Sequence, residues 1–279
     1  MQKAILFKIL QRRFKFRNPH HWVQIPDDFI YTQDEYRSAK AYIEMLAKRG
    51  IAFSYPECPY YPPAFLRMKE PPLFFEYLGE PIWLSLDLLS VVGARDVQVV
   101  SEQWMRLHLG PFMEEKKVGI VSGGANGVDQ FAHLTAIKNN VPTIVVLPSG
   151  LMQMYPRSLQ VLLREQKNKV CFLSEFEVNQ PVHKAHFYFR NRLIAALGLF
   201  TLVVQSSLRS GSMLTVHHCL EVGRPVATVP AHPQMAGFEG NIKLLQEGAF
   251  LVRGFDDLRD FWKAELQSNQ SLFGGSRHK

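Results

Sequence analysis

The chain has 279 residues, of which 47% are apolar and 20% charged, so a large buried core is expected and an intrinsically disordered chain is excluded. The formal net charge is +7, but residues 1–20 hold six lysines and arginines and no acid, which leaves the rest of the chain nearly neutral. An anionic partner would therefore have to meet a local cluster of cations rather than a general positive field.

The cysteines and the hydropathy pattern indicate the compartment. Cys58, Cys171 and Cys219 are widely spaced and form no CxxC pair, which argues against a zinc ribbon and a disulfide framework and is typical of a reducing cytoplasm. The sequence has no run of 18 apolar residues and no signal-peptide cleavage pattern near its start. We therefore expect a cytoplasmic protein that does not cross a membrane.

Residues 1–82 form the first predicted region, a small helical segment followed by a linker. Apolar residues recur at helical spacing between Ile5 and Phe14, with basic residues opposite, which predicts a helix packed on the core; contact with DNA or a membrane surface is the alternative. Seven prolines between Pro56 and Pro81 exclude a long helix and predict an ordered, extended linker that ends in a short strand at 73–77.

Residues 83–265 form the second predicted region, in which short apolar runs alternate with helical stretches. The predicted strands are 89–92, 118–121, 143–147, 170–173, 200–204, 226–229 and 250–252. The predicted helices are 97–116, 126–139, 157–168, 188–197, 212–222, 241–247 and 256–265. Because the strands are apolar on both faces and alternate with helices, the pattern predicts an α/β fold with a Rossmann-like, doubly wound and mostly parallel sheet. Residues 266–279 are predicted to form a flexible tail.

The loops after the predicted strands are the expected binding site, because ligands of such sheets bind beyond the carboxyl ends of the strands. Five of these six loops contain glycine, several of them beside serine or arginine. Glycine lets backbone amides approach a ligand closely, and each following helix presents its positive N-terminal end at the same edge. The edge therefore favours phosphate, although a tight turn is the alternative explanation for any single glycine.

The nucleotide motifs common in such folds are absent from the sequence. GARDVQ follows the first predicted strand in place of GxGxxG, the second loop reads GGANG with the wrong spacing, and no GK dipeptide occurs. NAD binding and ATP hydrolysis are therefore disfavoured, and no cofactor is predicted.

Bases alternate with aromatic residues in KAHFYFRNR (184–192), the strongest local cluster of the chain. Cations suit phosphates and aromatic rings suit unstacked bases, so the cluster is typical of a site for single-stranded nucleic acid; a plain loop-to-helix boundary is the alternative. Arg190 and Arg192 would project about 200° apart on a helix, so they are not expected to meet the same phosphate. Arg190, nearer the start of the helix, is the better candidate.

Asp129 and His133 stand four residues apart on a predicted helix and therefore share a face. They could form a metal pair, but the sequence offers no third ligand, and we expect a structural aspartate near a helix start beside a satisfied histidine. No nucleophile, base and orienting group can be assembled from the sequence. We therefore predict no metal and no catalytic residue, in a site that holds its ligand and does not cleave it.

Eight segments of the chain carry a resemblance to a known family. They are VVGAR (91–95), VSGGANGVDQFAHLTAI (121–137), TIVVLPSGLMQMYPR (143–157), LSEF (173–176), FRNRLIAAL (189–197), RSGSMLT (209–215), EVGRPVATVPAHP (221–233) and GNIKLLQEGAFLV (240–252). Together they resemble the DprA/Smf DNA-processing family over roughly residues 50–258.

This resemblance implies a non-hydrolytic protein that binds and protects single-stranded DNA, assists loading of the RecA recombinase during natural transformation, and forms a homodimer. It also implies a phosphate pocket on the glycine-rich rim of the sheet. The residues implied are Gly93, Arg95, Ser122, Gly123, Gly124, Lys184, Arg190, Asn191, Ser210, Gly211 and Ser212.

The sequence departs from the family pattern at three loop positions. Ala94 stands where the family commonly has serine, Asn126 where it usually has arginine, and Ala231 where it has glycine. The first two remove a hydroxyl and a charge, which affects the expected DNA affinity more than the fold. A C-terminal winged helix, present in many members, is not expected in the short tail.

Two other functions stay open at this point. A phosphoribohydrolase-like enzyme on a related fold would use the loop 209–215 with the nearby His218 and Glu221, although its usual Pro-Gly-Gly-x-Gly-Thr loop is missing. Alternatively, the chain is an interaction scaffold without DNA binding, as the changes at Ala94 and Asn126 would allow. Release of a nucleobase or binding of an oligonucleotide would distinguish these functions.

Overall fold

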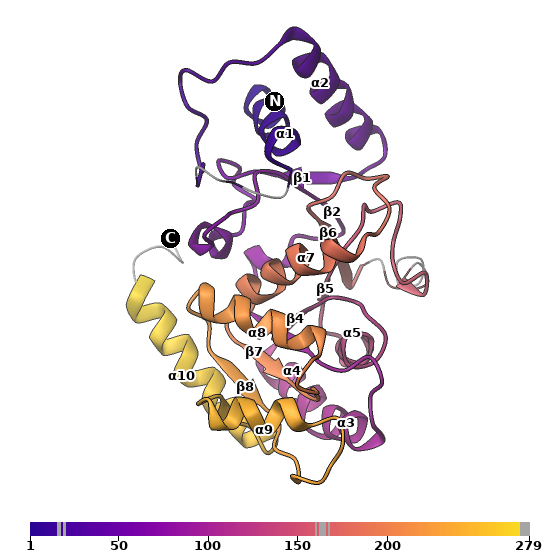
Figure 1. Cartoon of the computed structure of the whole chain (residues 1–279), viewed down its shortest axis with the longest axis vertical. Helices are drawn as coiled ribbons and strands as arrows, with labels where there is room; N and C mark the ends of the chain where they lie inside the picture. Colours follow the sequence, from indigo (N-terminus) through magenta and orange to yellow (C-terminus); the bar gives the residue numbers. More distant parts are fainter. Residues whose placement is uncertain (16–17, 19–20, 160, 162–165, 167, 274–279) are drawn as a thin grey trace.

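The computed structural model describes residues 1–273, apart from 16–17, 19–20, 160, 162–165 and 167 (Figure 1). Its centre is a nine-stranded sheet in the order β1-β2-β6-β5-β4-β3-β7-β8-β9. The parallel part contains β3 (Leu88–Val92), β4 (Gly119–Ser122), β5 (Thr143–Val146), β6 (Val170–Ser174), β7 (Thr201–Val203), β8 (Val226–Thr228) and β9 (Phe250–Leu251). The seven strands predicted for residues 83–265 are thereby confirmed, and the fold is α/β with a mostly parallel, Rossmann-like sheet.

Helices cover both faces of this sheet, as the continuous apolar strands require. The helices are α3 (Val99–Trp104), which continues through a π-helical turn (Met105–Leu109) into α4 (Gly110–Lys116), α5 (Val128–Lys138), α7 (Lys184–Leu197), α8 (Gly211–Glu221), α9 (Glu239–Gln246) and α10 (Phe255–Phe273). Side chains of β3 alternate between the layers: Leu88 and Val92 pack with α7 and α8, whereas Leu89 and Val91 pack with α4, α5 and α10.

The N-terminal segment adds two helices and two strands. Helix α1 (Gln2–Phe14) packs against α2 (Gln33–Lys48), which begins with a capping box between Thr32 and Glu35. Strand β2 (Phe75–Leu78) pairs antiparallel with β6, and β1 (Ala52–Ser54) pairs antiparallel with β2 at the edge of the sheet. The sequence predicts β2 but not β1. Figure 1 shows α1 and α2 side by side at one end of the molecule, beyond β1 and β2.

The basic N-terminal helix is a packing element, as its apolar periodicity predicts. Ile5, Ile9 and Leu10 are buried, and the basic side chains meet acids of neighbouring segments. Lys3 pairs with Glu57, and Arg13 makes two hydrogen bonds of 2.7 and 2.8 Å to Glu35. Lys8 and Arg12 pair with Glu177 at 3.2 and 2.6 Å, respectively. The positive charge of α1 is therefore balanced within the fold.

The ends of the predicted regions need one correction. The expected flexible tail does not begin at 266, because α10 continues to Phe273, with Leu266 packed on the core and Asn269 bonded to Arg67.

The boundary at 82/83 stays a prediction, and the sheet takes strands from both sides of it. Half of the residues of the helix expected at 157–168, namely 160, 162–165 and 167, lie outside the described residues. Within the described residues, no helix combines the length and hydropathy needed to span a membrane.

Candidate functional site

The candidate site lies where the chain reverses its direction of winding across the sheet. From β3 the chain proceeds outward to β4, β5 and β6, and then returns to place β7 on the other side of β3. Loops that leave β3 and β7 diverge at such a point and leave room for a ligand. The amide of Ala94 after β3 donates to the carbonyl of Gln205 after β7 at 2.8 Å, and the amide of Val128 donates to the carbonyl of Ala94 at 3.0 Å.

Two glycines allow this close assembly of loops. A β-carbon at Gly93 would lie 2.6–2.9 Å from the side chain of Val128, so the start of α5 could not pack on the end of β3. Gly127 has φ of +84°, which side chains rarely adopt, and a β-carbon there would overlap the carbonyls of Ala94 and Arg95. These two glycines therefore allow the loop after β3 to pack closely against the start of α5.

The loop after β4 is held by Asp129, in the first turn of α5. Its carboxylate accepts the amide hydrogens of Gly123 at 3.2 Å and Ala125 at 3.4 Å. The hydroxyl of Ser122 donates to the carbonyl of Val91 in the neighbouring strand. These groups are satisfied inside the protein, so Ser122 and the amide of Gly123 serve the shape of the loop in this structure.

Arg190 of α7 lies directly beneath this loop. A β-carbon at Gly123 would overlap its guanidinium group, and its Nη1 donates to the carbonyl of Val146 at the end of β5 at 2.8 Å. Arg190 is only 4% exposed. Burial lowers the pKa of Arg190 to about 10, while Asp129 raises it and Arg95 lowers it further. Arg190 therefore remains a cation at neutral pH beneath the loop.

A small pocket of about 50 Å³ opens above this buried cation. It is lined by the loops after β3, β4 and β5 and by α7, through Arg95, Gly123, Ala125, Asn126, Tyr155, Pro156 and Phe187. The ring of Phe187 lies beside two cations, with its centroid 5.5 Å from Cζ of Arg95 and 5.7 Å from Cζ of Arg190. Two guanidinium groups near one ring repel each other, and an anion placed between them would relieve that repulsion.

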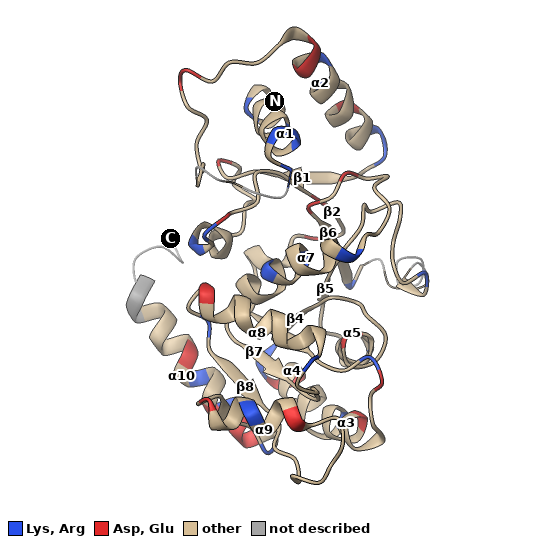
Figure 2. Ribbon diagram, in the orientation of Figure 1, with Lys and Arg blue, Asp and Glu red and all other residues tan. Residues whose placement is uncertain are grey.

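The remaining predicted residues continue the rim on either side of the pocket. Lys184 is the exposed first residue of α7, one turn before Phe187. Farther along α7, the side-chain amide of Asn191 donates to the carbonyl of Gly211 at the start of α8, at 3.3 Å. Ser210 and Ser212 share hydrogen bonds with Ser206, so their hydroxyls form one cluster beside that helix start. Figure 2 shows basic segments on α7, on the same side of the molecule as the loops beside α5.

The sequence-predicted residues therefore fall into two groups. The structure brings Arg95, Gly123 and Arg190 together at one pocket, whereas Asn191, Gly211 and the serines form a second cluster on the neighbouring loop. Gly124, with φ of +68°, packs on Val145 and Leu159 and shapes the loop. Arg192 pairs with Glu175 inside the protein, and the choice of Arg190 as the better candidate stays a prediction.

Sequence reasoning placed Tyr155 and Pro156 in the loop after β5, at the expected edge, but did not include them among the predicted site residues. Tyr155 and Pro156 follow β5 by nearly ten residues, and no periodic pattern ties them to the other loops. The edge of the Tyr155 ring meets the Phe187 ring, with centroids 6.2 Å apart. Phe187 belongs to the run of alternating basic and aromatic residues at 184–192, and this run was the sequence feature that indicated an aromatic contribution to the site.

Asp129 has the structural role predicted for it, whereas the histidine expected to be satisfied bonds only through Nδ1 among the described residues, because its buried Nε2 has no partner there. His133 is buried, and its Nδ1 lies 2.7 Å from the hydroxyl of Thr143. Burial lowers the pKa of His133 to about 3, so the ring is neutral. Within the described residues, no group of three histidine, cysteine or acidic side chains is arranged to hold a metal ion.

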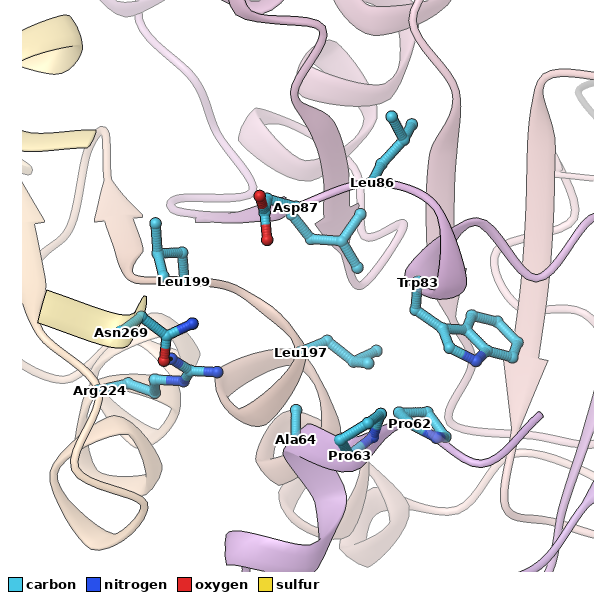
Figure 3. A pocket seen from close by; sticks show the side chains of 11 residues that line it. Pro62, Pro63, Ala64, Trp83, Leu86, Asp87, Leu197, Leu199, Arg224 and Asn269 are labelled. Carbon is cyan, nitrogen blue, oxygen red and sulfur yellow. Dashed lines mark hydrogen bonds between the residues drawn. The ribbon is translucent and has the colours of Figure 1, made fainter. Parts of the chain in front are cut away.

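Two further features lie away from this rim. His218 and Glu221, considered above for an enzyme, bond to each other at 2.8 Å near the end of α8. Figure 3 shows a pocket whose lining includes the apolar side chains of Trp83, Leu197 and Leu199 and the charged side chains of Asp87 and Arg224. Since Asp87 precedes β3 and Gly93 follows it, this pocket lies at the opposite end of the strand from the glycine loops.

Comparisons with known proteins agree with this geometry. Residues 52–263 match the family model described as DNA recombination-mediator protein A. The chain is 38% identical over 198 residues to protein Smf of Escherichia coli, covering 69% of this chain but only about half (52%) of that relative's length. It is 33% identical to DNA processing protein DprA of Streptococcus pneumoniae, covering 72% of this chain and 71% of the relative.

Solved structures show the same fold. DNA processing protein A from Streptococcus pneumoniae superimposes with a TM-score of 0.74 at 25% identity, covering 92% of each chain. DNA processing protein A from Helicobacter pylori, whose structure is described for its single-stranded DNA binding mode, gives a TM-score of 0.66 at 28% identity and covers 77% of this chain and 96% of that one. This chain therefore belongs to the DNA recombination-mediator protein A family, which includes the DprA and Smf proteins.

Proposed function

We propose that this chain binds single-stranded DNA through its sugar–phosphate backbone at the rim formed by the loops after β3, β4, β5 and β7 and by the start of α7. The observation that carries the proposal is that Arg95, which lines the pocket, and the buried Arg190 both lie within 6 Å of the ring of Phe187, another lining residue. The two cations suit a phosphate, and the ring offers a stacking surface for an unpaired base.

The electrostatics of the rim support a phosphate ligand. Within the described residues, Arg95 and Lys184 form no direct ion pair, unlike the cations of α1, so their charge is available to an anion. Arg190 also forms no direct ion pair there, but the nearby carboxylate of Asp129 offsets part of its charge. Lys184 is the first residue of α7 and adds a cation to the positive end of that helix. Compared with the family pattern, Ala94 and Asn126 remove hydrogen-bond donors from the rim, but the charges of Arg95, Lys184 and Arg190 remain.

The wider role proposed for the chain follows from its family. We propose that it acts as a recombination mediator in the cytoplasm, protects single strands without hydrolysing them, and assists loading of the RecA recombinase. The description of the matching family model as a recombination mediator supports this role. The direct measurement is the rate at which RecA assembles on single-stranded DNA already coated by a single-strand-binding protein. This rate should be higher with this chain than without it.

A homodimer is part of the proposed function. The edge strand β9 supports it, because Phe250 and Leu251 are 40% and 42% exposed on a strand that pairs with β8 on one side and with no other described strand on the other. An apolar edge of this kind invites a second copy. Sedimentation measurements should show a concentration-dependent dimer that Leu251→Asp weakens. A strictly monomeric chain at tens of micromolar would contradict this part of the proposal.

The DNA-binding proposal is tested by titrating labelled oligo-dT at several salt concentrations and following fluorescence anisotropy. Log affinity should fall linearly with log salt concentration, with a slope of about −0.7 for each phosphate that is neutralised. Lys184→Ala should weaken binding severalfold and reduce that slope. Lys48→Ala, which removes an exposed lysine at the end of α2, is the matched control and should change neither quantity.

Two results would overturn the proposal. Salt-independent or absent binding by the unmodified chain would leave the interaction scaffold as the better explanation. Equal effects of Lys184→Ala and Lys48→Ala would show that binding is not centred on this rim. Release of a nucleobase from a nucleoside monophosphate, measured in the same preparation, would instead support the phosphoribohydrolase-like alternative.

A further inference from the structure

The loop of residues 175–183, here called the β6–α7 loop, determines where α7 begins. It leads directly from β6 into the helix that supplies Lys184, Phe187 and Arg190 to the proposed DNA-binding rim. Phosphate and base contacts tolerate little displacement of such side chains, so whatever holds this loop also affects binding. The N-terminal helices contact this loop directly.

Gln11 of α1 makes the first of these contacts. Its Nε2 donates to the carbonyl of Glu175 at 2.6 Å and to the carbonyl of Phe74 at 2.8 Å, so it links the loop to the residue before β2. Its side-chain oxygen accepts a hydrogen bond from the ammonium group of Lys8 at 2.8 Å. Gln11 is 5% exposed, and these bonds replace water that cannot reach it.

Tyr42 of α2 makes the second contact. Its hydroxyl oxygen accepts the amide hydrogen of Val178 at 2.7 Å and donates its own hydrogen to the carboxylate of Glu76. Lys8 lies 4.1 Å from the centre of the Tyr42 ring and 3.2 Å from the carboxylate of Glu177. A single hydroxyl therefore joins α2, β2 and the β6–α7 loop.

The held residues of the loop contact α7 in turn. The carboxylate of Glu175 accepts two hydrogen bonds of 2.6 and 2.7 Å from Nη2 of Arg192. The ring of Phe176 stacks on His186, with centroids 4.2 Å apart. A continuous set of contacts thus runs from Gln11 and Tyr42 through the loop to α7.

We infer that Tyr42 and Gln11 are positioning residues for the DNA-binding rim: they hold the β6–α7 loop, and through it α7, without touching the ligand themselves. This inference rests on the proposed function. It assigns to the N-terminal helices a role in DNA affinity that does not depend on their own positive charge. The chemistry is that of a buried hydrogen-bond network that fixes the orientation of ligand-binding side chains.

The test compares Tyr42→Phe with a control in the same helix. Tyr42→Phe keeps the ring but removes the hydroxyl, so the amide of Val178, a residue 1% exposed, loses its acceptor. Thr32→Ala removes the N-terminal cap of α2 and weakens that helix without touching the loop. Oligo-dT affinity and amide hydrogen exchange of residues 175–190 are measured for both variants and for Arg95→Ala.

Tyr42→Phe should weaken DNA binding about fivefold, the factor that corresponds to one net hydrogen bond, and should speed exchange within 175–190. Thr32→Ala should lower the unfolding midpoint but leave the affinity and that exchange unchanged. Gln11→Ala should act like Tyr42→Phe, since it releases the same loop at Glu175.

Equal affinities in Tyr42→Phe, Thr32→Ala and the unmodified chain would overturn the inference, and so would equal losses in both variants. If Arg95→Ala still weakens binding in those cases, the proposed DNA-binding function is retained and only the inference about Tyr42 and Gln11 fails. If the unmodified chain fails to bind oligo-dT, the proposed function and this inference both fail, whatever the hydrogen exchange shows.

Discussion

The molecule has two regions rich in lysine and arginine, and they use the charge differently. In α1, Lys3, Arg12 and Arg13 each meet a glutamate from another part of the chain. On the rim, Arg95 and Arg190 approach the same aromatic ring, and within the described residues neither forms a direct ion pair. Figure 2 shows acidic segments on α2 and near β2, the neighbours of α1.

The comparison shows that density of basic residues in the sequence does not identify a binding surface. Residues 1–20 carry nearly all of the net charge, yet tertiary contacts neutralise most of it. The rim has fewer cations, and no acid of the described part of the chain forms a direct ion pair with them, although the carboxylate of Asp129 lies near Arg190. Local charge that the fold leaves unpaired is the better indicator of an anionic ligand.

The sharpest way to break this comparison is Arg190→Ala. We expect it to abolish measurable oligo-dT binding and to lower the free energy of unfolding by about 3 kcal/mol, because the buried carboxylate of Asp129 would lose its neighbouring cation. Anisotropy and chemical denaturation measure the two effects. Arg190→Lys, which keeps the charge, should lose less of both, and full binding by Arg190→Ala would show that the rim does not need this cation.

The second test concerns the network under α1. Burial raises the pKa of Glu76 to about 7 from its ordinary value of 4.5, so between these values the folded state holds a proton that the unfolded state releases. The contribution of Glu76 to the free energy of unfolding therefore falls as pH rises through this window, by on the order of 2 kcal/mol. Urea denaturation from pH 4.5 to pH 8 should show this decline, and Glu76→Gln should flatten it. An unchanged profile in the variant would contradict the assignment.

Arg95→Ala sharpens the comparison from the side of the rim. The side chain is exposed and, within the described part of the chain, makes no direct ion pair, so its loss should leave stability unchanged within about 0.5 kcal/mol. Oligo-dT affinity should fall about tenfold, and the salt slope should become shallower by about 0.7. A variant with unaltered affinity would remove Arg95 from the site.

Arg13→Ala should have the smallest effect of these variants. In contrast to Arg95→Ala, it should lower stability slightly and leave DNA affinity nearly unchanged. Its guanidinium is partly exposed and pairs with Glu35, so its removal should lower the free energy of unfolding by about 0.5 kcal/mol. Oligo-dT affinity should stay within about twofold of the unmodified chain. A tenfold loss would mean that α1 carries part of the DNA site and that the two regions share one function.

Much of the fold followed from sequence pattern. Apolar runs on both faces predicted the parallel strands, and helical spacing between Ile5 and Phe14 predicted the packed face of α1. The short β1 escaped prediction because three residues beside proline-rich sequence carry no periodic signal. The last eight residues of α10 escaped prediction, and one of them, Asn269, is held by Arg67, a partner far away in sequence.

The candidate site was predicted by location more than by the role of each residue. Its loops were identifiable because glycine, serine and arginine recur after strands that end at one edge. The inward orientation of Ser122 and the depth of Arg190 could not be predicted, since each depends on a neighbour from another strand, namely Val91 and Val146. Asp129 was expected to be structural, but the amides that it accepts became evident only from the folded loop.

The sequence by itself determined the alternation of strands and helices, the edge at which glycine-rich loops gather and the family resemblance, because these depend on periodicity and local chain geometry. Only the tertiary structure decided which charges remain available. Whether a lysine or arginine is neutralised depends on acids brought to it from distant segments, as Glu177 is brought to Arg12, and such pairings follow from packing and not from order along the chain.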